Sequence, residues 1–252
     1  MCATRILPAR SRFRSRSPQP ARGPATAPDR GSLPELRLYY DALLRAHGPQ
    51  HWWPGRTRFE VIVGAILTQS TSWSNVERAI VALRRENLLS PSAMEHVSTP
   101  RLAGLIRSSG YFRQKALKLK AFVHFLGEHY DASLDKLFAT PTPQLREQLL
   151  SVHGIGPETA DSILLYAGKH PVFVVDAYTR RILERHHLAD GQHSYEQIRQ
   201  LFEQNLPVSV PLYNEYHALI VHTGKHFCRK QVPDCEKCAL RPFLPGSEEL
   251  RP

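Results

Sequence analysis

The feature that most constrains the fold is a short turn between two predicted helices at residues 144–168. A helix over residues 144–152 leads into His153-Gly154-Ile155-Gly156, and Pro157 then opens a second helix. Glycines permit backbone angles that other residues avoid, and they allow close approach by a second molecule. The free N–H groups of a helix that starts at Pro157 point toward the turn and form an anion site suited to phosphate. An ordinary helix–helix turn is the alternative interpretation.

Helical spacing of apolar residues continues through the chain from residue 34 onward. The segment PVFVV at residues 171–175 looks like a strand, but a single strand has no partner, so we expect an extended linker. Short joints rich in proline and glycine separate about ten helices, and this organisation predicts an all-α fold. The expected helices cover residues 34–44, 58–67, about 72–83, a short one from 99, 113–130, 144–152, 157–167, one from 177, 195–205 and 213–227.

The charge of the chain favours a polyanionic partner. Lysine and arginine number 33 against 23 acidic residues, and the net charge is +10. Nucleic acid is a better match to this excess than a membrane surface, and no apolar run reaches the ~18–20 residues of a membrane helix. Residues 1–34 carry seven arginines and one aspartate. We expect residues 1–33 to form a disordered basic arm, a transit-like leader or a start assigned too early.

An aspartate follows the apolar linker, twenty residues beyond Gly156. In Val174-Val175-Asp176-Ala177 it stands where the next helix begins, and there it can be a simple cap worth about 1 kcal/mol. The hairpin, the spacing and Asp176 together resemble the helix-hairpin-helix DNA glycosylases of the endonuclease III superfamily. The resemblance covers roughly residues 34–240, and the sequence is most similar to the branch that removes 3-methyladenine.

The resemblance implies two helical domains with a cleft between them. Residues 50–170 would form a six-helix domain with the helix-hairpin-helix at about 144–168, and residues 34–49 plus 171–240 the second domain. Asp176 would be the catalytic carboxylate beside a flipped nucleotide. The residues expected to bind the DNA backbone are Gly154, Ile155, Gly156 and Thr159 of the hairpin together with Arg229 and Lys230.

Some members of the family carry a nucleophilic lysine two residues after the second hairpin glycine. That position is Glu158 here, and a carboxylate cannot form a Schiff base, so we expect a monofunctional glycosylase without AP-lyase activity. Gln69 and Tyr111 match the loops that fill the gap left by the flipped base. A polar helix end and surface packing are the alternatives for these two residues.

The resemblance also suggests a substrate. Trp52, Trp53 and Pro54 would line the base pocket, where an indole stacks well on a cationic alkylated purine such as 3-methyladenine. The alternatives are an endonuclease III-like glycosylase for oxidised pyrimidines and a non-catalytic helix-hairpin-helix DNA-binding protein. We expect a monomer that binds double-stranded DNA, in the cytoplasm or associated with the nucleoid.

Three cysteines lie close together near the carboxyl end. Cys228, Cys235 and Cys238 match three ligands of the family's [4Fe-4S] loop, while Leu244 stands at the fourth position. The alternatives are a three-thiolate cluster with a different fourth ligand, a three-iron form, a zinc site that includes His226, and an eroded site without metal. This clustering is not the spread of a disulfide framework and indicates a reducing intracellular setting.

Overall fold

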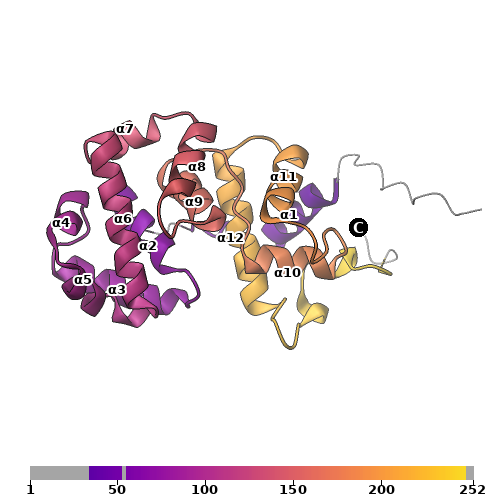
Figure 1. Ribbon diagram of the computed structural model, residues 1–252. Coiled ribbons are helices and arrows are strands. Elements are labelled where there is room, and N and C mark those ends of the chain that lie inside the picture. Colours follow the sequence, from indigo (N-terminus) through magenta and orange to yellow (C-terminus); the bar gives the residue numbers. More distant parts are fainter. Residues whose placement is uncertain (1–33, 53–54, 248–252) are drawn as a thin grey trace, which may run out of the picture. The chain divides into compact units, whose positions relative to one another are not determined.

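Helices account for all regular secondary structure in the part of the chain that the computed structural model describes, residues 34–52 and 55–247 (Figure 1). The prediction of an all-α fold is confirmed. The elements are α1 (Pro34–His47), α2 (Arg58–Leu67), α3 (Trp73–Arg85), α4 (Pro91–His96), α5 (Thr99–Leu105), η1 (Arg107–Ser109), α6 (Phe112–Tyr130), α7 (Leu134–Phe138), α8 (Thr142–Ser151), α9 (Pro157–Ser162), η2 (Ile163–Ala167), α10 (Ala177–Arg185), α11 (Tyr195–Asn205), α12 (Val210–His226), η3 (Cys235–Lys237) and η4 (Arg241–Phe243).

Helix α2 is buried on nearly every side, as its continuous apolar sequence predicts. Eight of its ten residues are buried, and α2 packs against α3, α6, α9 and η2. Glu60 differs from the other buried residues of α2 because it is charged, and its carboxylate forms an ion pair with Arg84 of α3 at 2.8 Å. Thr57 caps the helix by accepting a hydrogen bond from the Glu60 backbone N–H. A polar residue on an apolar helix is thus tolerated because it is paired.

Helix α9 continues directly into η2, a five-residue stretch of π-helix. All five residues of η2 are buried, and the segment packs against both α2 and α12. Helix α12 in turn packs against α1 and α10. The helix that follows the hairpin is therefore connected through η2 to α12, and α12 packs against α10, the helix that begins after Asp176. The proposed division into two domains stays a prediction.

Residues 171–175 connect η2 to α10 as an extended segment without strand pairing, as predicted. Val172, Phe173, Val174 and Val175 are all buried. Phe173 stacks on Phe202 of α11 with ring centroids 3.9 Å apart. This apolar anchoring fixes the place where α10 begins, and Asp176 is the residue immediately before it.

The interior of α6 differs from the sequence expectation. Amphipathic spacing over residues 113–130 predicts Leu117 on the inner face of this helix and Lys115, Lys118 and Lys120 largely on its outer face. Lys115 is instead 2% exposed and Leu117 is 46% exposed. The Lys115 ammonium donates to the backbone carbonyls of Leu67, at 2.9 Å, and Ser109, at 2.5 Å. Two carbonyl acceptors offset the loss of water around the buried charge, and together they tie the end of α2 to η1.

The predicted arm at residues 1–33 lies outside the described residues. Among the residues that are described, no helix has the length and the apolar character needed to cross a membrane.

Candidate active site

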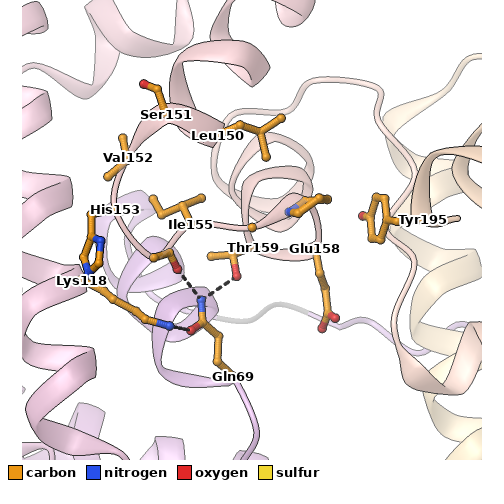
Figure 2. Close-up of a pocket in the computed structure, with 13 residues that line it drawn as sticks. Gln69, Lys118, Leu150, Ser151, Val152, His153, Ile155, Glu158, Thr159 and Tyr195 are labelled. Atoms are coloured by element: carbon orange, nitrogen blue, oxygen red, sulfur yellow. Dashed lines mark hydrogen bonds between the residues drawn. The ribbon is translucent and has the colours of Figure 1, made fainter.

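The turn predicted at residues 153–156 joins α8 to α9. Gly154 adopts φ = +83°, a left-handed backbone conformation, and a Cβ atom there would lie 2.3 Å from Cγ of Lys118. Glycine is required at this position for both reasons. Residues 150–159, Gln69, Lys118 and Tyr195 surround a hollow of about 730 Å³ (Figure 2). The hairpin therefore forms one wall of a concave surface.

Gly156 has a different role. Its φ is −93°, an angle open to any residue, so the expectation that it relieves backbone strain is wrong. A Cβ atom there would meet nothing within 4 Å. Gly156 precedes α9 at its N-cap position and is exposed. It leaves open space beside the free N–H groups of the helix. A side chain at this position would contact no other part of the protein, but it would obstruct a second molecule that approaches these N–H groups.

Replacing each glycine by alanine should separate these two roles. Gly154→Ala is expected to destabilise the fold by about 1–2 kcal/mol, because alanine is strained at positive φ and crowds Lys118. Gly156→Ala is expected to change stability by less than about 0.5 kcal/mol and to weaken binding to duplex DNA. Urea unfolding and fluorescence anisotropy measure the two effects. Equal loss of stability in the two variants would contradict this division.

A buried ion pair joins the two helices of the hairpin, α8 and α9. Arg146 of α8 donates to both carboxylate oxygens of Asp161 in α9, at 2.7 and 3.1 Å, and the Asp161 side chain is fully buried. The same guanidinium contacts Glu196 of α11 at 2.6 Å. One arginine thus links both helices of the hairpin to α11. Neither Arg146 nor Asp161 was singled out from the sequence, because nothing in their spacing indicates the pair.

Gln69 lies beside the hairpin rather than alone at a helix end. Its side-chain amide donates to the Gly154 carbonyl at 3.0 Å and to Oγ1 of Thr159 at 2.9 Å (Figure 2). Its carbonyl oxygen accepts a hydrogen bond from Lys118. The segment after α2 is therefore hydrogen-bonded to the hairpin, and Gln69 lines the same hollow as Ile155. Its predicted role as a plug stays a prediction.

Tyr111 occupies the other predicted wedge loop. It is 73% exposed and adopts φ = +43°, in the left-handed region, just before α6. A large apolar ring held in the solvent by a strained backbone position is uncommon. The Lys115 bond to the Ser109 carbonyl fixes the loop two residues upstream. Its surroundings thus leave the ring free to contact a second molecule.

Asp176 is the N-cap residue of α10. Its Oδ1 accepts hydrogen bonds from the backbone N–H of Thr179 at 2.8 Å and from the Thr179 hydroxyl at 2.9 Å. Its Oδ2 faces Nε2 of His217 in α12 at 3.6 Å, and the Asp176 side chain is 12% exposed. Burial acts to raise the pKa of Asp176, but His217 and Thr179 outweigh it and hold that pKa below its usual range. The carboxylate is therefore ionised near neutral pH.

Glu158 stands near Asp176 and reaches solvent at the edge of the hollow. The surrounding protein and the Asp176 charge raise the pKa of Glu158, while His217 and Arg180 act in the opposite sense. Two carboxylates thus face one region from α9 and α10. Figure 2 shows the Glu158 side chain directed away from the turn itself.

An aromatic cluster lies next to the two carboxylates. Trp52 stacks on the His217 ring, with centroids 5.4 Å apart and planes 18° apart, and it also contacts Tyr166 of η2. Trp52 is partly exposed and packs against the core. The predicted pocket residues Trp53 and Pro54 lie outside the described residues. His217 and Tyr166 were missed in the sequence, where a histidine inside an apolar helix carries no distinct signal.

Comparison with known proteins decides the family. Residues 63–208, more than half of the chain, match the family described as HhH-GPD superfamily base excision DNA repair protein. The chain belongs to the HhH-GPD superfamily. It is also 47% identical over 206 residues to a provisionally named DNA repair glycosylase of Methanocaldococcus jannaschii, which covers 81% of this chain and 93% of that protein.

Solved structures of the superfamily share the fold. A trapped covalent intermediate of endonuclease III with DNA superposes with a TM-score of 0.73 at 20% identity, covering 85% of this chain and 96% of that one. The 3-methyladenine DNA glycosylase MagIII of Helicobacter pylori, bound to 1,N6-ethenoadenine, gives 0.65 at 26% identity, covering 76% and 95%. Both the hairpin and Asp176 fall within the matched part of the HhH-GPD chain.

The cysteine loop of this HhH-GPD protein lies beyond α12. Cys228 is buried, Cys235 and Cys238 are partly exposed, and all three border one small hollow together with Leu244. Nη1 of Arg185 donates to Sγ of Cys228 at 3.1 Å. Burial raises the pKa of the Cys238 thiol. In the described part of the chain, no three side chains of the metal-ligating types are arranged to hold a metal ion.

These residues do not fit a cluster held by four protein thiolates, because three cysteines border this hollow and Leu244, which also borders it, occupies the fourth ligand position of the sequence motif. The loop has other supports. Arg185 also donates to the carbonyls of Arg229 and Lys230, at 2.9 and 3.0 Å. The Arg229 and Lys230 residues are exposed, as their predicted phosphate contacts require. His226 is exposed and its ring packs against that of His222.

Proposed function

We propose that this protein is a monofunctional DNA glycosylase that hydrolyses the bond between a damaged purine and its sugar in duplex DNA. The observation that carries the proposal is Asp176, an ionised and largely buried carboxylate held at the start of α10, with Glu158 in the place of the motif lysine. Membership in the HhH-GPD superfamily supports glycosylase chemistry. The position of Glu158 supports water rather than an amine as the nucleophile.

Hydrolysis of the bond between base and sugar requires one fixed negative charge near the sugar. As the C1′–N bond lengthens, its electron pair moves to the base, and positive charge develops on the sugar. The Asp176 carboxylate stabilises that charge, and it orients the water that adds to C1′ and accepts a proton from it. Its Oδ1 is occupied by two hydrogen bonds from Thr179, so Oδ2 is the oxygen available to the reaction.

Two features favour an alkylated purine as the base. Such a base is a cation in DNA, and the bond electrons neutralise it as it leaves, so it needs no proton from an acid. Asp176 and Glu158 present two carboxylates to the same region, which attracts a cation. The partly exposed indole of Trp52 lies beside them, and indole faces bind cationic rings well.

The hairpin is proposed to hold the DNA backbone while Gln69 and Tyr111 enter the base stack. The open space at Gly156 and the free N–H groups of α9 support a phosphate contact. Lys118 adds a positive charge to the same hollow. The exposure of Tyr111 supports its insertion. We further propose a monomer that acts where the cell's DNA is, in the cytoplasm or nucleoid.

A panel of duplexes tests the proposal. Each duplex contains 3-methyladenine, thymine glycol or uracil, and free base is measured by chromatography at saturating protein. We expect release of 3-methyladenine at a rate at least tenfold above that of the other two bases. Preferred release of thymine glycol would favour the oxidised-pyrimidine alternative. Binding without release of any of these bases would favour a DNA-binding module without catalysis.

Borohydride is the control for the nucleophile in the same reactions. A Schiff base between a lysine and the sugar is reduced to a stable protein–DNA adduct, whereas hydrolysis by water leaves none. We expect free base, an intact strand until alkali is added, and no adduct. A trapped adduct would show that an amine attacks the sugar and that Glu158 does not define the mechanism.

No step of this proposal passes through the cysteine loop. A cluster with three thiolate ligands stays a prediction, and iron and sulfide analysis of the purified protein tests it.

A further inference from the structure

His217 is a buried titratable residue that the proposed chemistry has not used. It lies in the middle of α12 and is 4% exposed. Its Nδ1 is 2.5 Å from the hydroxyl of Tyr166, and its Nε2 is 3.6 Å from Oδ2 of Asp176. Among the described residues, Nε2 has no partner at hydrogen-bond distance. A buried imidazole nitrogen aimed at a carboxylate and not otherwise bonded needs an explanation.

The contacts of His217 with Tyr166 and with Asp176 indicate which nitrogen of a neutral ring carries the hydrogen. The phenol is buried, and burial together with the charges of Asp176 and Glu158 raises its pKa well above the usual value. The hydroxyl therefore keeps its proton and is able to donate it to Nδ1 of His217. The opposite tautomer, with the hydrogen on Nδ1, would turn the bare lone pair of Nε2 toward Oδ2 of Asp176, so the form in which the hydroxyl donates is favoured. A neutral imidazole that accepts at one nitrogen carries its hydrogen on the other. The N–H of His217 then points from Nε2 toward Oδ2 of Asp176.

The two oxygens of Asp176 are consequently held from different helices. Thr179 of α10 holds Oδ1 through two hydrogen bonds, and His217 of α12 is the polar group that faces Oδ2. The ring itself cannot turn freely, because Trp52 stacks on it with planes 18° apart. Helices α10 and α12 are packed closely, since a Cβ atom at Gly224 would lie 2.3 Å from the Tyr178 ring. The contact between His217 and Asp176 thus lies between two closely packed helices.

We infer that His217 is a positioning residue for Asp176: Tyr166 holds it as the Nε2–H tautomer, and its N–H orients the carboxylate and favours its ionised form. The inference rests on the proposed function for its catalytic consequence. The arrangement of Tyr166, His217 and Asp176 does not depend on which base is removed.

The pH dependence of base release is the readout that a merely structural role would not move. Single-turnover release requires ionised Asp176, so the rate falls as pH drops through its pKa. Loss of a hydrogen-bond donor raises a carboxyl pKa. His217→Leu is therefore expected to move the acid limb of the profile up by about 1 pH unit. At neutral pH the carboxylate stays ionised, and the loss of its fixed orientation is expected to lower the rate about tenfold.

Other groups near Asp176 are common to every variant. Burial and the Asp176 charge raise the pKa of Glu158 in α9, Arg180 of α10 acts to lower it, and the Tyr166 phenol stays neutral. His217→Gln retains a donor near the Nε2 position, so it is expected to restore the acid limb toward that of the unaltered protein. His124→Gln removes an exposed histidine of α6 and should leave the profile unchanged.

The tautomer can be measured without any activity. Long-range ¹⁵N–¹H correlation spectra of the unaltered protein distinguish the two neutral forms of histidine, and the signal absent from His217→Gln identifies residue 217. We expect the Nε2–H form, with loss of that preference in Tyr166→Phe. An Nδ1–H form, or an acid limb that does not move in His217→Leu, would overturn the inference. Failure of base release in the unaltered protein would instead reject the proposed function, and the spectrum would still decide the tautomer.

Discussion

Replacing Asp176 with asparagine is expected to lower the single-turnover rate of base release by about 10³-fold. Asparagine keeps the shape of the side chain and an acceptor at Oδ1, so the hydrogen bonds from Thr179 can persist. It removes the negative charge that the developing cation requires. The variant should therefore fold and bind undamaged duplex with unchanged affinity, while release of free base is lost.

The matched control is an aspartate with an ion pair outside the site. Asp41→Asn disrupts a surface pair with Arg37 within α1 and should leave the rate of base release unchanged. Thermal unfolding of both variants shows whether the loss belongs to chemistry or to folding. If Asp176→Asn fails to fold, Asp176→Ser provides a smaller side chain that can still cap α10.

Replacing Arg146 with methionine is expected to lower the free energy of unfolding by about 3–5 kcal/mol. The change leaves Asp161, which is fully buried, without both of its hydrogen bonds from Arg146. An uncompensated buried charge costs far more than a lost surface pair. Urea denaturation followed by circular dichroism measures the difference, and an unchanged slope with denaturant identifies it as a loss of stability.

Two further variants control that measurement. Arg101→Met breaks an exposed ion pair with Glu86, and its expected cost is below about 1 kcal/mol. Adding Asp161→Asn to Arg146→Met removes the unpaired charge and should recover part of the lost stability. A cost for Arg146→Met as small as that for Arg101→Met would contradict the bracing role of the Arg146–Asp161 pair.

The sequence was sufficient to predict the all-α architecture and most helix positions. Apolar periodicity and capping residues act locally, and the observed helices begin and end within a few residues of the predicted bounds. The extended segment at 171–175 was also predicted, because a lone strand has no pairing partner. The position of Asp176 directly after this apolar segment therefore predicted that a helix begins there.

Lys115 shows where periodicity fails. A lysine in an amphipathic helix is expected to face solvent. The neighbouring sequence does not indicate the two buried backbone carbonyls to which Lys115 donates. Gly156 shows a second limit, since a glycine can be required by space outside the protein rather than by backbone angle. The position of Lys115 depends on contacts with segments far apart in the chain, whereas Gly156 borders open space.

The candidate site was predicted only in part. Asp176 and Glu158 were identified through the resemblance to helix-hairpin-helix glycosylases, and in the structure the charge of Asp176 acts on Glu158. His217 stands 41 residues beyond Asp176 in an otherwise apolar stretch, and Arg146 belongs to a helix chosen only for its pattern. Their partners are set by helix packing, which single-sequence patterns do not encode.

The Asp176 carboxylate is proposed to drive hydrolysis of the base–sugar bond. The most direct test of this role is a time course of free base released from a 3-methyladenine duplex, with the unaltered protein and Asp176→Asn each saturated with DNA. We expect rapid release by the first, about 10³-fold slower release by the second, and equal affinity of the two proteins for undamaged duplex. Similar rates for the two proteins would contradict this role.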